Sequence, residues 1–262
     1  MIKEQDTNFQ TPVLERALSI IELLSYSREG LGISDIVRIL GYPKNSVFRI
    51  TGTLYQQGYL NRDMKTKFFT LSRKFIDIGY SALGDQELIE ESIDSMREIR
   101  NLTKETTLLG IVHGKQGIIL NQIPSSHQIK VTVDVGMSFN LYCSAPGKAF
   151  LAFLPEKECQ ELVHTLELKK FTDRTITSAS RLFEEFRKIR EQGFSTDLAE
   201  EFEGVHCVGA PVLNQNGYPI ALVWVTGPSY RFPVQNLEPI GKVVKENVEK
   251  ISRKYGFQNT TE

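Results

Sequence analysis

The segment from Ile33 to Asp63 most constrains the fold, because its sequence predicts two short helices joined by a tight turn and followed by a strand. Ser34 is expected to cap the first helix and Gly41 to end it, since serine favours N-caps and glycine favours the residue after a helix. Proline is tolerated in the first turn of a helix, so the second helix is expected to begin at Pro43. This order is typical of the helix-turn-helix motif, whose second helix enters the major groove of DNA.

The second of these helices has two chemically different faces. Apolar residues at spacings of three and four, Val47, Ile50 and Leu54, predict its buried side. The opposite side is polar and basic, as suits a surface that reads DNA. Six residues of this side and one residue of the first helix are expected to contact DNA. They are Lys44, Asn45, Ser46, Phe48, Arg49 and Thr53 on the second helix, and Ser34 on the first.

The flanking segments are expected to complete a small domain. Upstream, a helix opened by Thr11-Pro12 carries an apolar stripe of Leu14, Leu18, Ile21 and Leu24. Downstream, a strand begins at Tyr59 and Lys67–Leu71 returns from a turn at 63–66, which predicts a hairpin, or wing, beside the second helix. The wing residues expected to reach DNA are Arg62, Lys65 and Lys67.

The distribution of charge supports this interpretation. Between Arg28 and Lys74, nine Lys and Arg stand against three acidic residues, a local net charge of +6 in a chain whose net charge is −1. Neutralisation of phosphates supplies most nonspecific affinity for DNA and requires such a patch. Charge alone would equally suit a helical hairpin with a solvated basic face. The order of helix, turn, helix and wing favours DNA binding.

The chain is long enough for a second domain, because 262 residues suit two domains that each bury a core. Hydrophobic and charged fractions of 40% and 24% are those of an ordinary soluble protein. Residues 1–12 lack the apolar segment of a secretory signal, and the apolar runs are too short to span a bilayer. Three irregularly spaced cysteines, Cys143, Cys159 and Cys207, indicate a reduced cytoplasmic interior rather than a disulfide framework.

A domain boundary is expected near Gly84. Beyond it, Asp85 can cap a longer helix whose outer face is acidic. The apolar stripe of this helix consists of Ile89, Ile93, Met96 and Ile99. Such a stripe suits a dimer interface, and it also suits packing on the helix's own domain.

From Thr106 the hydrophobic period changes to two, which predicts antiparallel strands. The expected strands are Leu108–Val112, Ile118–Ile123, Gln128–Val135, Val205–Leu213 and Tyr218–Thr226. The expected helices are Ala145–Leu154, a second from Pro155, Arg181–Gln192 and Val234–Tyr255. Hairpins with helices on their faces predict an α+β domain.

Signatures of enzymes do not fit this second domain. It has no G-x-S-x-G elbow, and Gly147-Lys148 lacks the remaining residues of a phosphate-binding loop. His206 and Cys207 are adjacent on a predicted strand, so they face opposite ways and cannot bind one metal ion. The other histidines lack the spacing of zinc ligands. No catalytic residue, metal or cofactor is therefore expected.

A small-molecule pocket is the chemical feature that remains. Ser144–Gly147 leads into a helix, whose free N–H groups and positive dipole end favour an anion. Trp224 and Thr226 share one face of a strand, and Asp197 is expected, with two glutamates, in a loop after a strand. Trp224 suits a core as well as a pocket, and the acidic run also suits a solvated surface.

Taken together, these stretches resemble the IclR-type bacterial transcription regulators from about Pro12 to Gly256. The specific segments are LYCSAPGKAFLAFL, IREQGFSTDLAEEFEGVHCVGAPV and VWVTGPSYR; the helix-turn-helix stretch is less specific. The resemblance implies a winged helix-turn-helix domain (residues 10–75), linker helices (76–100) and a GAF-like effector-binding domain with an antiparallel sheet (101–258). It also implies homodimers or homotetramers that bind a pseudo-palindromic operator in double-stranded DNA.

In such regulators a small organic acid binds the C-terminal domain. By similarity, the pocket wall of this chain would be Ala145, Pro146, Asp197, Val205, Cys207, Trp224 and Thr226. Trp224 stands where relatives that bind very small keto acids place small polar residues, and Pro146 removes one backbone donor. Both differences favour a larger sugar acid or aromatic acid.

The sequence is thus interpreted as that of a cytoplasmic, ligand-responsive regulator of catabolic genes, whether repressor or activator. Two other classes are weighed against it. A metabolic hydrolase or transferase would show turnover, and a sensor module acting on a protein partner would lack salt-sensitive binding to duplex DNA.

Overall fold

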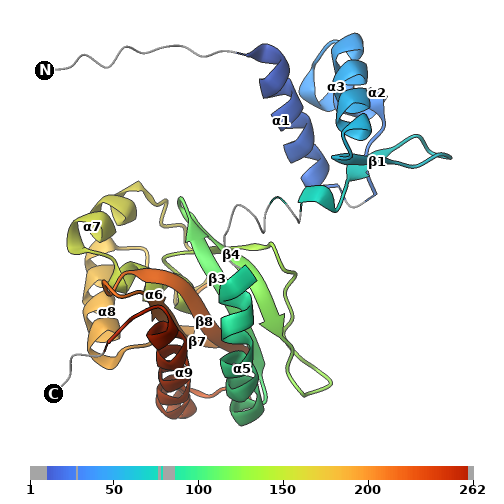
Figure 1. The fold of residues 1–262 in the computed structure, drawn as a ribbon. Helices are drawn as coiled ribbons and strands as arrows, with labels where there is room; N and C mark the ends of the chain where they lie inside the picture. Colours follow the sequence, from blue (N-terminus) through green and yellow to red (C-terminus); the bar gives the residue numbers. More distant parts are fainter. Residues whose placement is uncertain (1–10, 28, 76–77, 79–85, 259–262) are drawn as a thin grey trace, which may run out of the picture. The chain divides into compact units, whose positions relative to one another are not determined.

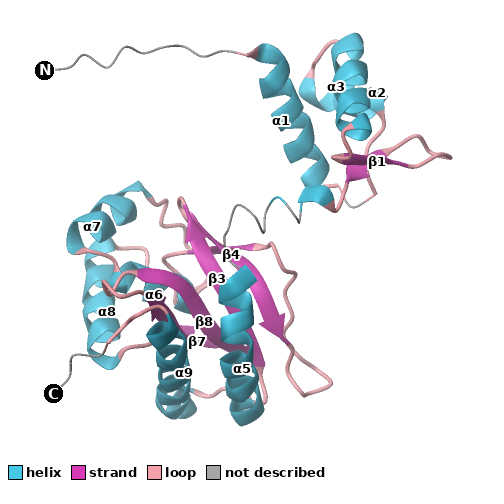
Figure 2. Cartoon of the chain, viewed as in Figure 1, coloured by secondary structure: helices cyan, strands magenta, loops and turns pink. Residues whose placement is uncertain are grey.

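The computed structural model describes residues 11–27, 29–75, 78 and 86–258. They belong to two compact units, Met1–Gln86 and Glu87–Glu262, drawn in Figures 1 and 2. The described part of the first unit consists of helices and one hairpin, and that of the second contains an antiparallel sheet covered by helices. Each unit has a hydrophobic core of its own.

The first unit is a winged helix-turn-helix, as predicted. Its elements are α1 (Pro12–Ser25), α2 (Ile33–Leu40), α3 (Lys44–Gln56), β1 (Leu60–Arg62) and β2 (Phe69–Leu71). β1 and β2 pair antiparallel, and Leu31 exchanges backbone hydrogen bonds of 3.1 and 2.9 Å with Phe69. These bonds attach the hairpin to the chain just before α2. The core combines residues of all five elements: Ile20, Leu24, Ile36, Val47, Ile50, Leu60 and Phe69.

The start of α2 differs from the prediction. The N-cap is Gly32 and not Ser34, and the Asp35 carboxylate accepts the Gly32 N–H at 3.3 Å. Asp35 thus satisfies a backbone donor at the helix start, and Ser34 is left exposed within the first turn. Gly41 ends the helix in the left-handed conformation, with φ of 68°, as predicted.

The predicted apolar stripe of α1 is confirmed for Leu24 and is wrong for Leu14 and Leu18. Ile20 and Leu24 are buried, whereas Leu14 and Leu18 are 57% and 51% exposed. Two overlapping apolar faces fit the helical period of α1, and the sequence pattern could not choose between them. The helix therefore keeps an exposed apolar surface, consisting of Val13, Leu14 and Leu18.

The second unit is built on a six-stranded antiparallel sheet in the order β5-β4-β3-β8-β7-β6. The strands are β3 (Thr106–His113), β4 (Gln116–Ile123), β5 (Ser138–Asn140), β6 (Ser195–Leu198), β7 (Val205–Leu213) and β8 (Pro219–Pro228). The predicted hairpins β3–β4 and β7–β8 are confirmed. β5 and β6 were not predicted, because three and four residues are too few to establish an alternating pattern.

Helices cover this sheet. α6 (Ala145–Phe153), α7 (Glu156–Thr165) and α8 (Ala179–Gln192) form one core, in which Phe186 of α8 and Leu151 of α6 are fully buried. α9 (Val234–Lys254) packs on β7, β6 and β8, and it lies beside α5 (Gln86–Thr103), as Figure 1 shows. Ion pairs from Lys250 to Glu98, at 2.7 Å, and from Lys254 to Glu91 join α9 to α5.

The apolar stripe of α5 is turned partly inward. Met96 and Ile99 are fully buried within their own unit, which favours packing on the helix's own domain over a dimer interface for these two residues. Ile89 and Ile93 are half-buried. Asp85, the predicted cap, lies outside the described residues.

The predicted strand Gln128–Val135 is wrong. These residues form a loop, in which Val131 and Val133 are half-buried and Ile129 is exposed. Side chains bind two of its carbonyl groups: Thr106 Oγ1 donates to the Val131 carbonyl at 2.6 Å, and Gln122 Nε2 donates to the Val133 carbonyl at 2.6 Å. The alternating pattern therefore identified which side chains turn toward the domain, but it did not predict strand pairing.

Candidate functional sites on the two units

The outer side of α3 is the candidate nucleic-acid interface. Of the seven helical residues predicted to contact DNA, the α3 residues Lys44, Asn45, Phe48, Arg49 and Thr53 are exposed, as is Ser34 on α2. Ser46 is half-buried, and its hydroxyl accepts a hydrogen bond of 3.2 Å from Arg16, which ties α1 to α3. Gln56 was missed: it is exposed and follows Asn45 and Arg49 along one helical stripe, so the 3.6-residue period could have identified it.

Gly52 lies on the same outer side of α3, one turn after Phe48. A Cβ atom built there would meet no atom of the described residues within 4 Å, so packing among them does not require a glycine. Glycine inside a helix costs about 0.5–1 kcal/mol relative to alanine. A missing side chain at this place leaves the backbone open to close approach by a partner.

The wing carries the three predicted basic residues, all of them exposed. Asp63 holds its turn, because Oδ1 accepts hydrogen bonds from Lys65 N, at 2.8 Å, and Thr66 N, at 2.7 Å, and these bonds lower the pKa of Asp63. The Arg62 guanidinium lies 5.5 Å from the centre of the Phe69 ring, and the Lys67 amine donates to the Met64 carbonyl at 2.6 Å. The turn thereby presents Lys65 at the tip of the hairpin.

The second unit contains a cavity of about 530 Å³ between the start of α6, the loop 128–138 and one face of the sheet. Six residues predicted for a pocket wall line it: Pro146, Asp197, Val205, Cys207, Trp224 and Thr226. The seventh, Ala145, is fully buried and does not reach the cavity. Sequence reasoning missed the apolar remainder of the wall, notably Val131, Val133 and Phe202, because loop residues distant in sequence give no signal of shared burial.

Strand register explains why the polar wall residues meet. Asp197 lies on β6 and not, as predicted, in a loop; it pairs with Cys207 of β7, which in turn pairs with Thr226 of β8. Cross-strand partners point to the same face of a sheet, so the three side chains form one row. Cys207 Sγ donates to Thr226 Oγ1 at 3.3 Å, which leaves the Thr226 hydroxyl proton for a ligand.

The cavity is acidic. Burial raises the pKa of Asp197 to about 7, although the Glu200 N–H bound to its Oδ1 at 2.7 Å acts in the opposite direction. Burial also raises the pKa of Glu201, whose carboxylate accepts a hydrogen bond of 2.6 Å from Asn140. The wall includes no lysine or arginine among the residues that the structure describes. At neutral pH, Asp197 can therefore either accept or donate a hydrogen bond.

The start of α6 does not offer the free donors that were predicted for an anion. Ser144 caps the helix itself: its hydroxyl accepts the Gly147 N–H at 3.1 Å, and its carbonyl accepts the Lys148 N–H at 3.0 Å. Pro146 has no N–H, and Ala145 is buried away from the cavity. Because its own N-cap consumes these groups, the helix start is not the anion site of this cavity.

Trp224 belongs both to the core and to the cavity wall, the two alternatives that the sequence left open. It is buried in the core, with its ring centre 5.2 Å from that of Phe139, and it also forms part of the cavity wall. Gly209, its cross-strand partner on β7, makes this possible: a Cβ there would lie 3.0 Å from Trp224 Cβ and 3.3 Å from Pro146 N. The glycine lets the start of α6 approach the sheet closely.

The described residues contain no cluster of three or more His, Cys, Asp or Glu suited to a metal ion. His206 and Cys207 point to opposite faces of β7, as predicted, with His206 Nδ1 2.8 Å from the Phe232 carbonyl. None of the described helices has the length and apolar character needed to cross a bilayer.

Comparison with known proteins agrees with this arrangement of domains. The IclR helix-turn-helix domain matches residues 13–64, and the bacterial transcriptional regulator IclR C-terminal domain matches residues 80–253. The HTH-type transcriptional regulator KdgR of Escherichia coli K12 is 29% identical over 93% of this chain and 92% of its own. The HTH-type transcriptional regulator XynR of the same organism is 26% identical over 93% and 97%.

Solved structures show the same similarity. The crystal structure of the Thermotoga maritima IclR superposes with a TM-score of 0.77, at 31% identity, over 93% of this chain and 98% of that one. A putative transcriptional regulator from Rhodococcus sp. RHA1 has a TM-score of 0.82 at 22% identity, over 94% and 98%. This chain belongs to the IclR family of bacterial transcriptional regulators, which combine a DNA-binding helix-turn-helix domain with a domain that responds to small-molecule effectors.

Proposed function

We propose that α3 reads the bases of a pseudo-palindromic operator while the wing contacts phosphates. The observation that supports this assignment is the exposed outer side of α3, where Asn45, Arg49 and Gln56 follow one another around an unobstructed Gly52. Arginine and asparagine side chains are suited to bidentate hydrogen bonds with guanine and adenine edges in the major groove. Lys65, held at the tip of the hairpin, is suited to phosphates, which every sequence presents alike.

Two copies of the chain would provide two reading helices, about 34–36 Å apart on successive major grooves. We propose a homodimer, or a pair of dimers, as the form that binds DNA. The exposed apolar surface of α1, consisting of Val13, Leu14 and Leu18, supports this proposal, because apolar side chains gathered on one face favour contact with a second copy.

The effector is proposed to be a small hydroxylated organic acid, such as a sugar acid, bound in the cavity of the second unit. Asp197 and Glu201 are suited to accept hydrogen bonds from ligand hydroxyls, and the Thr226 hydroxyl is free to donate one. A carboxylate on the ligand would be tolerated because the raised pKa of Asp197 lets that group carry a proton. Trp224 would pack on the carbon skeleton.

The effector changes DNA affinity only if it binds two arrangements of the protein with different affinities.

No catalytic activity is part of this proposal, since the cavity combines acidic groups and hydroxyls without a nucleophile activated by a base: burial raises the pKa of the Cys207 thiol and opposes thiolate formation. The proposed site of action is the cytoplasm, where the chromosome is.

A thermal-shift screen of sugar acids, aromatic acids and keto acids against the full-length protein tests the proposal. A ligand at about 100 times its Kd should add roughly 2.7 kcal/mol to the free energy of unfolding. Calorimetry with the best compound should then show binding about 10- to 100-fold weaker for Asp197→Ala and for Thr226→Val, with DNA binding unchanged without ligand. The exposed Ser180→Ala serves as control. Equal affinity in all four proteins would place the effector elsewhere.

A further inference from the structure

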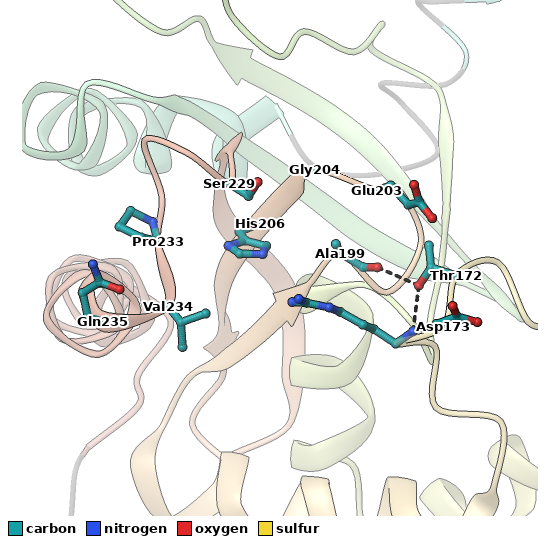
Figure 3. Close-up of a pocket in the computed structure, with 11 residues that line it drawn as sticks. Thr172, Asp173, Ala199, Glu203, Gly204, His206, Ser229, Pro233, Val234 and Gln235 are labelled. Carbon is teal, nitrogen blue, oxygen red and sulfur yellow. Dashed lines mark hydrogen bonds between the residues drawn. The ribbon is translucent and has the colours of Figure 1, made fainter.

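A second cavity, of about 610 Å³, lies on the opposite side of β7 from the first. His206 lines this second cavity, and its neighbour Cys207 lines the first. Figure 3 shows the His206 ring with Pro233 and Val234, at the start of α9, on one side and Ala199 and Thr172 on the other. Three separate segments of the chain therefore converge on this cavity.

The first of these segments is the start of α9. Pro233 is the N-cap of this 21-residue helix, and the first bond of the turn runs from Asn236 N to the Pro233 carbonyl. The N–H groups of Val234 and Gln235, which both line the cavity, have no partner among the described residues. Together with the helix dipole, these groups favour a negative charge.

His206 gives an independent indication of a ligand. Its side chain is only 5% exposed, and Nδ1 lies 2.8 Å from the Phe232 carbonyl. Because a carbonyl can only accept, Nδ1 carries a proton, and Nε2 on the opposite edge of the ring has no partner among the described residues. Because His206 lines the cavity, this unpaired Nε2 is available to a ligand and is not sealed within the core.

Arg174 supplies a fixed positive charge. Its Nη1 donates to the Leu198 carbonyl at 3.3 Å, and the rest of its guanidinium has no partner within the described part of the chain. Two acidic residues also line the cavity. Asp173 is already paired, with its carboxylate 2.6 Å from Lys170, whereas Glu203 is exposed and opposes an anion.

We propose that this cavity is a second ligand site, which binds a small molecule through one carboxylate or phosphate group. Arg174 and the N–H groups at the start of α9 bind the anionic oxygens, and His206 Nε2 accepts a hydrogen bond from a hydroxyl of the ligand. Ala199, Glu203 and Gly204 border this cavity, and Glu203 also borders the first one, so the two ligands would share a wall.

Nuclear magnetic resonance on the full-length protein tests the proposal. The His206 imidazole resonance is assigned by its loss in His206→Asn and is then followed during separate titrations with inorganic phosphate and with acetate at constant ionic strength. Saturable shifts of His206 are expected with at least one of these anions. The more tightly bound anion identifies the class of ligand group, phosphate or carboxylate.

Matched variants distinguish a specific anion site from a nonspecific effect of positive surface charge. Arg174→Gln should weaken binding about tenfold, since one charge-assisted contact is removed, and Glu203→Gln should tighten it. Lys157→Gln removes an equal charge from an exposed side chain of α7 and should leave the affinity unchanged. A His206 shift that is linear in both anions, or that is the same in Arg174→Gln and Lys157→Gln, would overturn the proposal.

Discussion

Lys148 and Glu200 form an ion pair whose side chains are only 1% and 7% exposed. It connects the first helical turn of α6 with the segment that follows β6. Hydroxyl groups of Thr172 and Thr175 donate to the Glu200 carbonyl at 3.4 and 2.6 Å, so the backbone of this residue is fixed as well. The pair therefore anchors the segment that separates the two cavities of the effector domain.

Breaking this pair should destabilise the effector domain. In Lys148→Met, Glu200 loses its partner in a site where burial already raises the pKa of its carboxyl group, and one oxygen, Oε2, has no hydrogen-bond partner. Removal of one member of a buried pair costs about 3–5 kcal/mol. Urea unfolding can be followed by the fluorescence of Trp224, the single tryptophan of the chain.

The double variant Lys148→Met/Glu200→Leu is the matched control. It should regain most of the lost stability, because an apolar pair of similar size leaves no charge buried without a partner. A loss below about 1 kcal/mol in the single variant would contradict the assignment of this pair as an anchor.

Asp197 should make the effector domain less stable as the pH rises. Burial raises the pKa of Asp197 from 3.8 to about 7, so the folded state binds this proton more tightly than the unfolded state does. The stabilisation that comes from the bound proton is complete below pH 3.8 and is lost as the pH rises through 7. Asp197→Asn keeps the acceptor for the Glu200 N–H but cannot ionise. It should match the wild type at acidic pH and exceed its free energy of unfolding by an amount on the order of 4 kcal/mol above neutral pH.

Urea unfolding of the ligand-free protein at several pH values measures this difference. Asp173→Asn is the control, because the pKa of Asp173 is lowered by Lys170 and its carboxylate is exposed. If Asp197→Asn and the wild type show the same dependence on pH, then the Asp197 carboxyl group is solvated rather than buried.

The local sequence pattern predicted most helices and long strands correctly, but it predicted less well which segments pair with one another. The HTH, the two long hairpins and the helices of the effector domain followed from periodicity and glycine stops, because a local period largely determines a long element. Asp197 was placed in a loop, since its four-residue strand is defined only by pairing with β7. The strand predicted at Gln128–Val135 is a loop instead: side chains of β3 and β4, and not a neighbouring strand, bind the carbonyl groups of Val131 and Val133.

The residues of the 530 Å³ cavity illustrate the same limit. Pro146, Cys207 and Trp224 were recognised through family resemblance, whereas the apolar residues contributed by the loop 128–138 were not. The anion site at the start of α6 was predicted from a general property of helix N-termini. It failed because the hydroxyl of Ser144 already satisfies the Gly147 N–H. The sequence alone does not show that a side chain already accepts such an N–H group; the folded structure does.

Two basic residues of the first unit should affect DNA binding differently. Arg49→Ala should weaken operator binding by about 1–3 kcal/mol and relax the preference at one base pair, if the guanidinium reads a guanine edge. Lys65→Ala should weaken all sequences alike and reduce the slope of log affinity against log salt by roughly one. Fluorescence anisotropy on duplexes selected in vitro, over a range of salt, measures both effects. Unchanged binding in both folded variants would remove these residues from the interface.

Dimer formation should depend on the exposed side of α1. Leu18→Asp places a charge in the apolar surface formed with Val13 and Leu14, and it should lower the assembly state without unfolding the helix, because Leu18 is 51% exposed. Light scattering at micromolar concentration reports the mass. Met64→Asp makes the same kind of change at an exposed residue of the wing and should leave the mass unchanged. A wild-type protein that is already monomeric under these conditions would count against the proposal.

Gly52 allows stability and DNA binding to be separated in one substitution. Alanine at this position would meet no atom within 4 Å in the described part of the chain, and it should stabilise α3 by about 0.5–1 kcal/mol. If the backbone of α3 approaches DNA closely at Gly52, the same methyl group should weaken operator binding several-fold while the first unit becomes more resistant to unfolding. The exposed Gln57→Ala, at the C-cap of α3 and outside the residues assigned to DNA, is the control. A Gly52→Ala protein that is more stable and binds the operator as tightly as the wild type would show that DNA does not approach α3 at this residue.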